Sequence, residues 1–147
     1  MKLCEQNDLI VTSYNTSTDA IDAFSQNLEI QNEEKYVIAY SKNKTTAARI
    51  HFDVAHELGH ILLHDWNEDL ETITPNDFRE REIEANEFAS AFLLPEETFI
   101  KDVGSYAGNV QYYEILKRKW NTSMSAMIMR SKNLGLIDYE RYQSKMM

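Results

Sequence analysis

Cysteine is nearly absent from this chain of 147 residues: Cys4 is the only one, so no disulfide can form within the chain. Glycine and proline are also scarce, at four and two residues, which leaves little room for flexible linkers. There is no apolar run of about 20 residues and no basic and apolar leader, so we expect a cytoplasmic protein without a membrane segment. Basic residues are outnumbered, and the net charge of −9 disfavours a polyanionic partner.

The remaining composition is that of a folded domain. Hydrophobic residues make up 43% of the chain and aromatic residues 11%, which excludes wholesale disorder. A length of 147 residues suits one compact unit with a sizeable core. We therefore expect a single domain over 1–147, with a core over 1–109 and a helical C-terminal subdomain over 110–147.

The most informative motif is His-Glu-Leu-Gly-His at residues 56–60. On a helix, residues four apart lie on the same face, so the imidazoles of His56 and His60 can converge on one metal ion. Glu57 falls beside them, where a carboxylate can take a proton from an activated water. Because a catalytic zinc site normally has three protein ligands, the motif predicts a zinc hydrolase whose third ligand comes from another segment.

The residues around this motif favour a helix. The chain has no proline from Thr45 to the end of the motif, and Thr45 or Thr46 is the expected N-cap. Glycine inside a helix lowers the stability of the helix by about 1 kcal/mol relative to alanine, so Gly59 indicates a close neighbour. We expect that neighbour to be a strand. The apolar stripe expected to face the core consists of Val54, Leu58, Ile61 and Leu62.

Three other possible ligands are less suitable. His64 lies one turn beyond His60, too far along the helix axis to share the ion, and we expect it at the helix end or in support of a ligand. His51 has no partner at ligand spacing, and Cys4 lies in an unpatterned N-terminus. We therefore look for the third ligand further along the chain.

The segment from Asp77 to Leu94 is expected to supply this ligand from a second helix, which Pro95 ends. Asp77 is the expected N-cap, with Glu80 three residues on. The expected apolar face consists of Ile83, Ala85, Phe88, Ala89, Phe92 and Leu93. The glutamates available to a metal ion are Glu80, Glu82, Glu84 and Glu87. Most of them must be solvated surface charges, because a buried unpaired carboxylate is too costly.

Three stretches together resemble the ImmA/IrrE family of metallopeptidases: Phe52-Asp-Val-Ala-His-Glu-Leu-Gly-His-Ile-Leu-Leu-His64, Glu82-Ile-Glu-Ala-Asn-Glu-Phe-Ala and Leu93-Leu-Pro95. The resemblance covers about residues 36–137. It implies a zincin-like α+β fold, mostly helical, with a small sheet beside the active-site helix. It also implies that Glu82 is the third zinc ligand, with Glu84 as its rival, and that Asn86 orients a ligand from outside the coordination sphere.

The other segments alternate between strand and helix patterns. We expect strands over 8–14 and 35–41, a helix over 18–28 and a helical turn over 96–103. Residues 65–76 read as an exposed acidic loop. The strand over 35–41 either covers the core or serves as an edge strand that pairs with an extended substrate through main-chain hydrogen bonds.

The C-terminal part has the opposite charge. Residues 110–147 carry a net charge of +4, whereas residues 1–109 carry −13. Helices are expected over 109–120 and 123–133, with Ser123 as a cap and Gly135 as a stop, in a helix-turn-helix-like arrangement. The basic residues able to meet phosphates are Lys117, Arg118, Lys119, Arg130 and Lys132. Because the whole chain is acidic, we favour a structural role without direct nucleic-acid binding. The expected core residues are Tyr112, Tyr113, Leu116, Trp120, Met124, Met127 and Ile128.

We therefore predict a zinc-dependent endopeptidase with Glu57 as general base. By resemblance, its substrate is a protein, such as a transcriptional repressor of a phage, mobile element or stress operon. None of the eight tyrosines is singled out as an oxyanion stabiliser, and the oligomeric state is open. One alternative is a metal-binding, antitoxin-like interaction module that does not cut its partner. Another is a DNA-binding regulator with a degenerate peptidase half, which would show salt-dependent duplex affinity.

Overall fold

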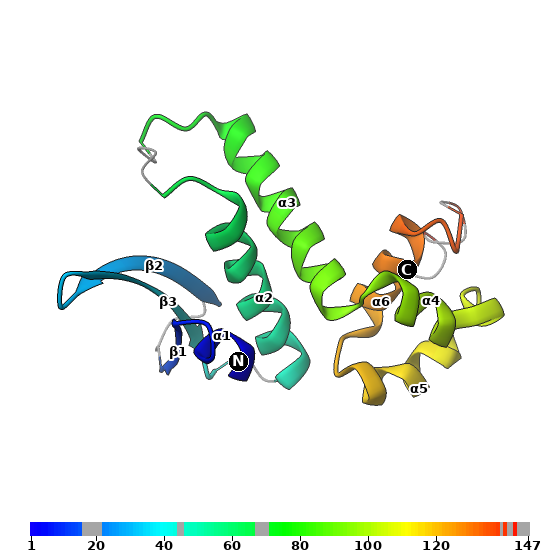
Figure 1. Cartoon of the computed structure of the whole chain (residues 1–147). Helices are drawn as coiled ribbons and strands as arrows, with labels where there is room; N and C mark the ends of the chain where they lie inside the picture. The colour runs from blue at the N-terminus through cyan, green and yellow to red at the C-terminus, as the bar shows by residue number, and fades with distance from the viewer. Residues whose placement is uncertain (16–21, 44–45, 67–70, 139, 141–142, 144–147) are drawn as a thin grey trace. The chain divides into compact units, whose positions relative to one another are not determined.

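The structure is a computed structural model of the chain, and it describes residues 1–15, 22–43, 46–66, 71–138, 140 and 143. Within these residues the fold is α+β, as predicted, with three strands and six α-helices (Figure 1). The N-terminal elements are α1 (Lys2–Glu5), β1 (Leu9–Tyr14), β2 (Ala23–Ile30), β3 (Glu33–Ser41) and α2 (Ala47–Leu63). The later elements are α3 (Pro75–Leu93), α4 (Glu96–Val103), the 3-10 helix η1 (Gly104–Tyr106), α5 (Val110–Trp120) and α6 (Met124–Asn133).

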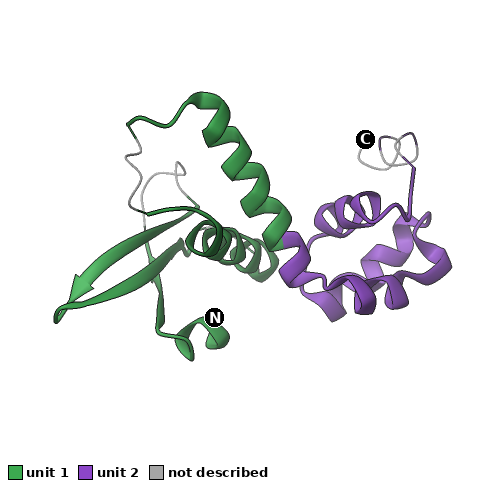
Figure 2. Cartoon of the chain, turned by 45° about the horizontal axis from the view of Figure 1, so that its top comes forward, with its two compact units in different colours: residues 1–89 green, residues 90–147 purple. Residues whose placement is uncertain are grey.

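The chain divides into two compact units, residues 1–89 and residues 90–147 (Figure 2). The first unit contains the sheet, α2 and most of α3, whereas the second is helical. In the described part of the chain, no helix combines the length and the apolar composition needed to cross a membrane.

The sheet of the first unit has the strand order β1-β3-β2. β1 pairs parallel with β3, and β2 pairs antiparallel with it. The strands predicted over 8–14 and 35–41 are confirmed as β1 and β3. Because β3 lies between the other two strands, the edge-strand alternative for residues 35–41 is wrong; the other alternative holds, since Ile38 of β3 is part of the buried core. The edge strands of this sheet are β1 and β2.

The helix predicted over 18–28 is wrong in its described part, because residues 23–28 belong to β2. Residues 18–21 lie outside the described residues. β2 turns into β3 through Gln31 and Asn32, whose φ angles are 54° and 63°. Positive φ at both central residues is typical of a type I′ turn, whose twist suits a tight hairpin. Pairing along β3 therefore outweighs the weak local helix preference of this segment.

Helix α2 packs against β2 and β3 (Figure 1). Its N-cap is Thr46, whose side-chain oxygen accepts a hydrogen bond from the Arg49 backbone N–H at 3.2 Å. Ile61 packs on the buried core of this unit, but Leu62 is 61% exposed, so the predicted apolar stripe is wrong at that position. Leu63 is exposed as well, at 52%. The buried core consists of Cys4, Ile38, Val54 and Leu58.

Helix α3 begins at Pro75, with Thr74 before it. Thr74 Oγ1 accepts a hydrogen bond from the Asp77 backbone N–H at 3.1 Å, and Asp77 Oδ2 accepts one from the Thr74 backbone N–H at 3.4 Å. This reciprocal pair is a capping box with proline at the first helical position. The prediction of Asp77 as N-cap is wrong, because Asp77 is the third residue of the helix.

The apolar face predicted for α3 is buried only in part. Ala85 and Ala89 are fully buried, whereas Ile83 is 50% exposed and Phe92 is 42% exposed. The prediction is wrong for these two large residues. The buried positions are small because the α3 backbone at Ala85 lies directly against α2.

The second unit has a helical core of its own. Tyr113, Leu116, Met127 and Ile128 are buried in this core, and Tyr112, Trp120 and Met124 pack against it, which confirms the predicted set. Ser123 caps α6 by accepting a hydrogen bond from the Ala126 backbone N–H at 3.1 Å. Gly135 has a φ of 70°, and the backbone N–H groups of Gly135 and Leu136 bond to the carbonyls of Lys132 and Ser131. This Schellman motif ends α6 where the sequence predicts a stop.

Candidate metal centre

Helix α2 presents two imidazoles on one face. His56 and His60 lie one helical turn apart, and their Nε2 atoms are 3.0 Å from each other. Both side chains are mostly buried, with 16% and 19% of their surface exposed. The i, i+4 spacing of the motif thus places two nitrogen donors side by side.

Helix α3 brings the carboxylate of Glu82 to the same point. Glu82 Oε2 lies 3.3 Å from His56 Nε2, and Glu82 Oε1 lies 3.0 Å from His60 Nε2. The donor atoms of the three residues all lie within 4.8 Å of one another. Donors of a tetrahedral zinc ion stand about 2.0–2.2 Å from the metal and hence about 3.3 Å apart. Two imidazoles and a carboxylate at these distances fit a small divalent cation.

Glu84, the rival third ligand, lies elsewhere. Its Oε2 is 3.0 Å from Nε2 of His64, and its side chain is 58% exposed. Glu82 and Glu84 are two residues apart on a helix and therefore point in different directions. The structure brings Glu82, and not Glu84, to the pair of imidazoles.

The Nδ1 atoms of both candidate ligands also have partners. His56 Nδ1 lies 2.9 Å from the amide oxygen of Asn86, which comes from α3. His60 Nδ1 lies 2.9 Å from Nδ1 of His64, the C-cap residue of α2. Each ring is therefore held at the nitrogen that points away from the cluster.

Glu57 is held from the sheet. Ser25 on β2 donates a hydrogen bond from its Oγ to Glu57 Oε2, with an oxygen–oxygen distance of 2.5 Å. Sequence reasoning misses Ser25, because it predicts a helix for residues 18–28. A strand pattern would not have found it either, because alternation puts the apolar Phe24 and Leu28 on one face and Ser25 on the other, and in the structure Phe24 and Leu28 are the exposed residues.

Burial favours the neutral form of His60. Burial lowers the pKa of this imidazole below its ordinary value of 6.5, and the neighbouring His56 acts in the same direction. Glu57 and Glu82 raise the pKa but do not reverse the shift. A neutral imidazole keeps the lone pair that a metal ion requires.

Gly59 allows α3 to approach the ligand face of α2. A Cβ atom at this position would lie 3.1 Å from Cδ1 of Phe88, 3.2 Å from Cα of Ala85 and 3.3 Å from the Ala85 carbonyl oxygen. The predicted close neighbour therefore exists, but it is helix α3 and not a strand. Figure 1 shows α2 and α3 side by side. This close packing brings Glu82 and Asn86 to the imidazoles.

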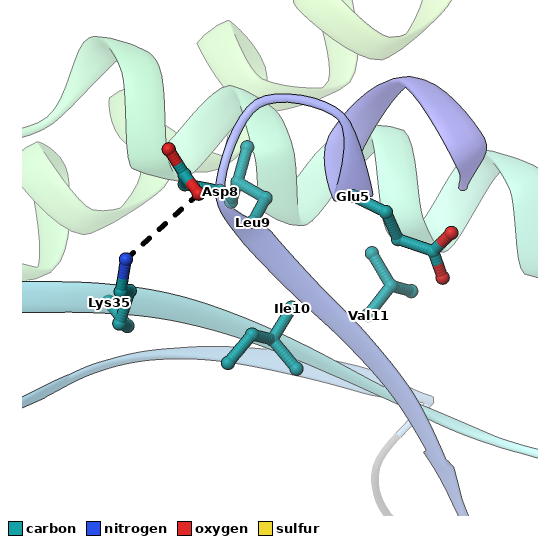
Figure 3. A pocket seen from close by; sticks show the side chains of 6 residues that line it. All are labelled: Glu5, Asp8, Leu9, Ile10, Val11 and Lys35. Carbon is teal, nitrogen blue, oxygen red and sulfur yellow. Dashed lines mark ion pairs between the residues drawn. The ribbon is translucent and has the colours of Figure 1, made fainter. Parts of the chain in front are cut away.

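The other candidate groups stand apart from this cluster. Cys4 is buried in the core of the first unit, and His51 is not part of the metal-ligating group. A surface pocket shares no residue with the cluster; it is lined by Glu5, Asp8, Leu9, Ile10, Val11 and Lys35 (Figure 3). Lys35 Nζ lies 4.0 Å from Asp8 and 3.0 Å from Glu33, so its charge is paired.

A comparison of the sequence with known protein families agrees with the geometry of the His56, His60 and Glu82 cluster. The sequence profile of the IrrE N-terminal-like domain, a peptidase family, matches residues 4–132. The match spans α2 and α3 with all the candidate ligands. No curated protein gives a significant match to the chain.

Proposed function

The chain belongs to the IrrE N-terminal-like family of metallopeptidases, and we propose that it is a zinc-dependent endopeptidase. The observation that carries the proposal is the convergence of donor atoms from His56, His60 and Glu82 within 4.8 Å of one another. Glu57 follows His56 directly in the sequence, so the same helix supplies both the imidazoles and a carboxylate for proton transfer.

The roles of the residues follow from their chemistry. His56, His60 and Glu82 would hold the ion, and a bound zinc ion supplies Lewis acidity that activates water and polarises a carbonyl. Glu57 accepts the proton of the attacking water and delivers it to the leaving amine. Ser25 fixes the Glu57 carboxylate, and Asn86 fixes the ring of His56.

The substrate we propose is an extended segment of a regulatory protein. β2 is an edge strand and carries Ser25, so a peptide that pairs along this edge would lie close to Glu57. The net charge of −9 favours basic segments. The family resemblance favours a cytoplasmic transcriptional repressor of a phage, mobile element or stress operon.

The DNA-binding alternative has weaker support. Lys119 Nζ lies 2.6 Å from Asp102, and Lys117 Nζ lies 3.9 Å from Glu114. Arg130 Nε donates a hydrogen bond to the Leu94 carbonyl at 3.1 Å. Because these basic groups have partners within their own unit, we propose no direct contact with nucleic acid.

Zinc content and cleavage by a matched pair of variants test the proposal. The wild-type chain should bind about one zinc ion and cut the protein encoded by a neighbouring gene, as followed by mass spectrometry. Glu57→Gln should retain the metal and lose cleavage, whereas Glu87→Gln, a change at an exposed glutamate of α3, should keep both. Cleavage by Glu57→Gln would show that Glu57 is not the general base. Zinc-dependent binding of the partner without cleavage by the wild type would support the interaction-module alternative.

A further inference from the structure

A chain of two side chains extends from His60 toward the surface. His60 Nδ1 lies 2.9 Å from His64 Nδ1, and His64 Nε2 lies 3.0 Å from Glu84 Oε2. The His64 side chain is 9% exposed, whereas that of Glu84 is 58% exposed. These hydrogen bonds, called the relay below, therefore connect the candidate ligand His60 to the solvated carboxylate of Glu84 through the mostly buried imidazole of His64.

The positions of the hydrogen atoms between His60, His64 and Glu84 follow from the carboxylate of Glu84. Glu84 as a carboxylate accepts only, so Nε2 of His64 must carry the hydrogen that bonds to it. A neutral His64 then has a lone pair on Nδ1 and accepts a hydrogen bond from Nδ1–H of His60. Nε2 of His60 is left with its lone pair, and this atom is the one that faces His56 and Glu82.

We propose that His64 and Glu84 are positioning residues that fix the tautomer and ring orientation of His60 for metal binding. The inference rests on the proposed function, because it assigns to His60 a ligand role through Nε2. Without Glu84, His64 can carry its hydrogen on Nδ1 and then points a donor at the Nδ1–H of His60. Such a donor–donor contact would turn the His60 ring away from the cluster.

The two candidate histidine ligands are thus supported differently. His56 donates to a neutral amide oxygen of Asn86, and His60 donates to an imidazole that is itself bonded to a carboxylate. The carboxylate of Glu84 polarises these hydrogen bonds and makes His60 a more electron-rich metal ligand than His56. Glu84 therefore affects the metal ion only through His64.

Zinc affinity measured by competition with a chromophoric chelator tests this arrangement on the full chain. His64→Ala should weaken zinc binding about 10- to 100-fold, the usual effect of losing a partner of a metal-binding histidine. Glu84→Ala, at an exposed position that should not impair folding, should weaken binding toward the lower end of that range, about 10-fold. Glu84→Gln should restore most of the affinity, because its amide oxygen still accepts from His64.

Two controls separate the relay from a general charge effect. Glu87→Ala removes a negative charge from the same helix at an exposed position and should leave the zinc affinity unchanged. In a His64→Ala background, Glu84→Ala should cause no further loss, because its only route to His60 has been removed. An equal loss in Glu87→Ala, or a full second loss in the double variant, would overturn the proposal.

Nuclear magnetic resonance of the imidazoles provides a readout apart from affinity. Long-range proton–nitrogen correlations in the zinc-loaded chain should show hydrogen on Nδ1 of His60 and on Nε2 of His64. In Glu84→Ala, His64 should become a mixture of tautomers. A wild-type His64 that carries hydrogen on Nδ1 would contradict the relay.

The same measurements distinguish failure of the relay from failure of the proposed function. If the wild type binds zinc, His60→Ala abolishes binding and the His64 and Glu84 variants match the wild type, only the relay is wrong. If the wild-type chain binds no zinc, the metal site itself is wrong and the relay falls with it.

Discussion

Ser25 Oγ donates a hydrogen bond to Glu57 Oε2 across 2.5 Å, and this contact joins the edge strand β2 to the helix that carries the candidate ligands. A general base must be held within reach of the proton that it removes. Because β2 is also the edge along which we propose that a peptide pairs, one strand would both contact the substrate and orient the carboxylate. Removal of the Ser25 hydroxyl is therefore expected to affect the chemical step.

Ser25→Ala should slow cleavage by about tenfold and leave zinc affinity unchanged. A hydrogen bond to a charged group contributes about 1.5 kcal/mol, which corresponds to roughly a factor of ten in rate. Ser25→Thr keeps the hydroxyl, suits a strand and should retain most of the rate. Single-turnover cleavage of the identified partner protein measures both variants. A wild-type rate in Ser25→Ala would show that this contact does not position the base.

Glu82→Ala should lose the metal, because it removes the only carboxylate among the three converging donors. Glu84→Ala should still bind about one zinc ion per chain at saturating metal, since its carboxylate lies on His64 and not in the cluster. Metal content after dialysis against a fixed free zinc concentration compares the two. The opposite pattern would make Glu84 the third ligand.

The sequence predicted the parts of the site that depend on helical spacing. The i, i+4 relation of His56 and His60 and the capping by Thr46 are local properties, and the structure has both. Glu82 was selected by family resemblance, because spacing alone did not choose among the glutamates of α3. Ser25 was missed because its position depends on hairpin pairing with β3, which the local preference of residues 18–28 did not reveal.

The metal-free protein should lose stability as the pH falls below neutral, in part because of His60. The pKa of folded His60 is lowered by burial, so the unfolded chain binds the proton first as the pH passes through 6.5. The contribution of neutral His60 is thus fully present above that pH and is lost as the pH falls toward the lower folded pKa. Urea unfolding at several pH values should give a slope of at most about 1.4 kcal/mol per pH unit from this group. His60→Gln should remove that part of the slope, and parallel curves for the two proteins would contradict the assignment.

Gly59→Ala should destabilise the first unit and weaken zinc binding together. Alanine favours a helix by about 1 kcal/mol over glycine. Here, however, its Cβ would lie 3.2 Å and 3.3 Å from backbone atoms of Ala85, which can move only if α3 moves. Such overpacking costs about 1–3 kcal/mol of folding stability and would shift Glu82 away from the imidazoles.

Gly108→Ala is the control, because a Cβ there meets nothing within 4 Å. Urea unfolding and zinc competition on both variants measure the effect. If Gly59→Ala stabilises the protein and leaves zinc affinity unchanged, close packing of α3 on α2 does not set the geometry of the site.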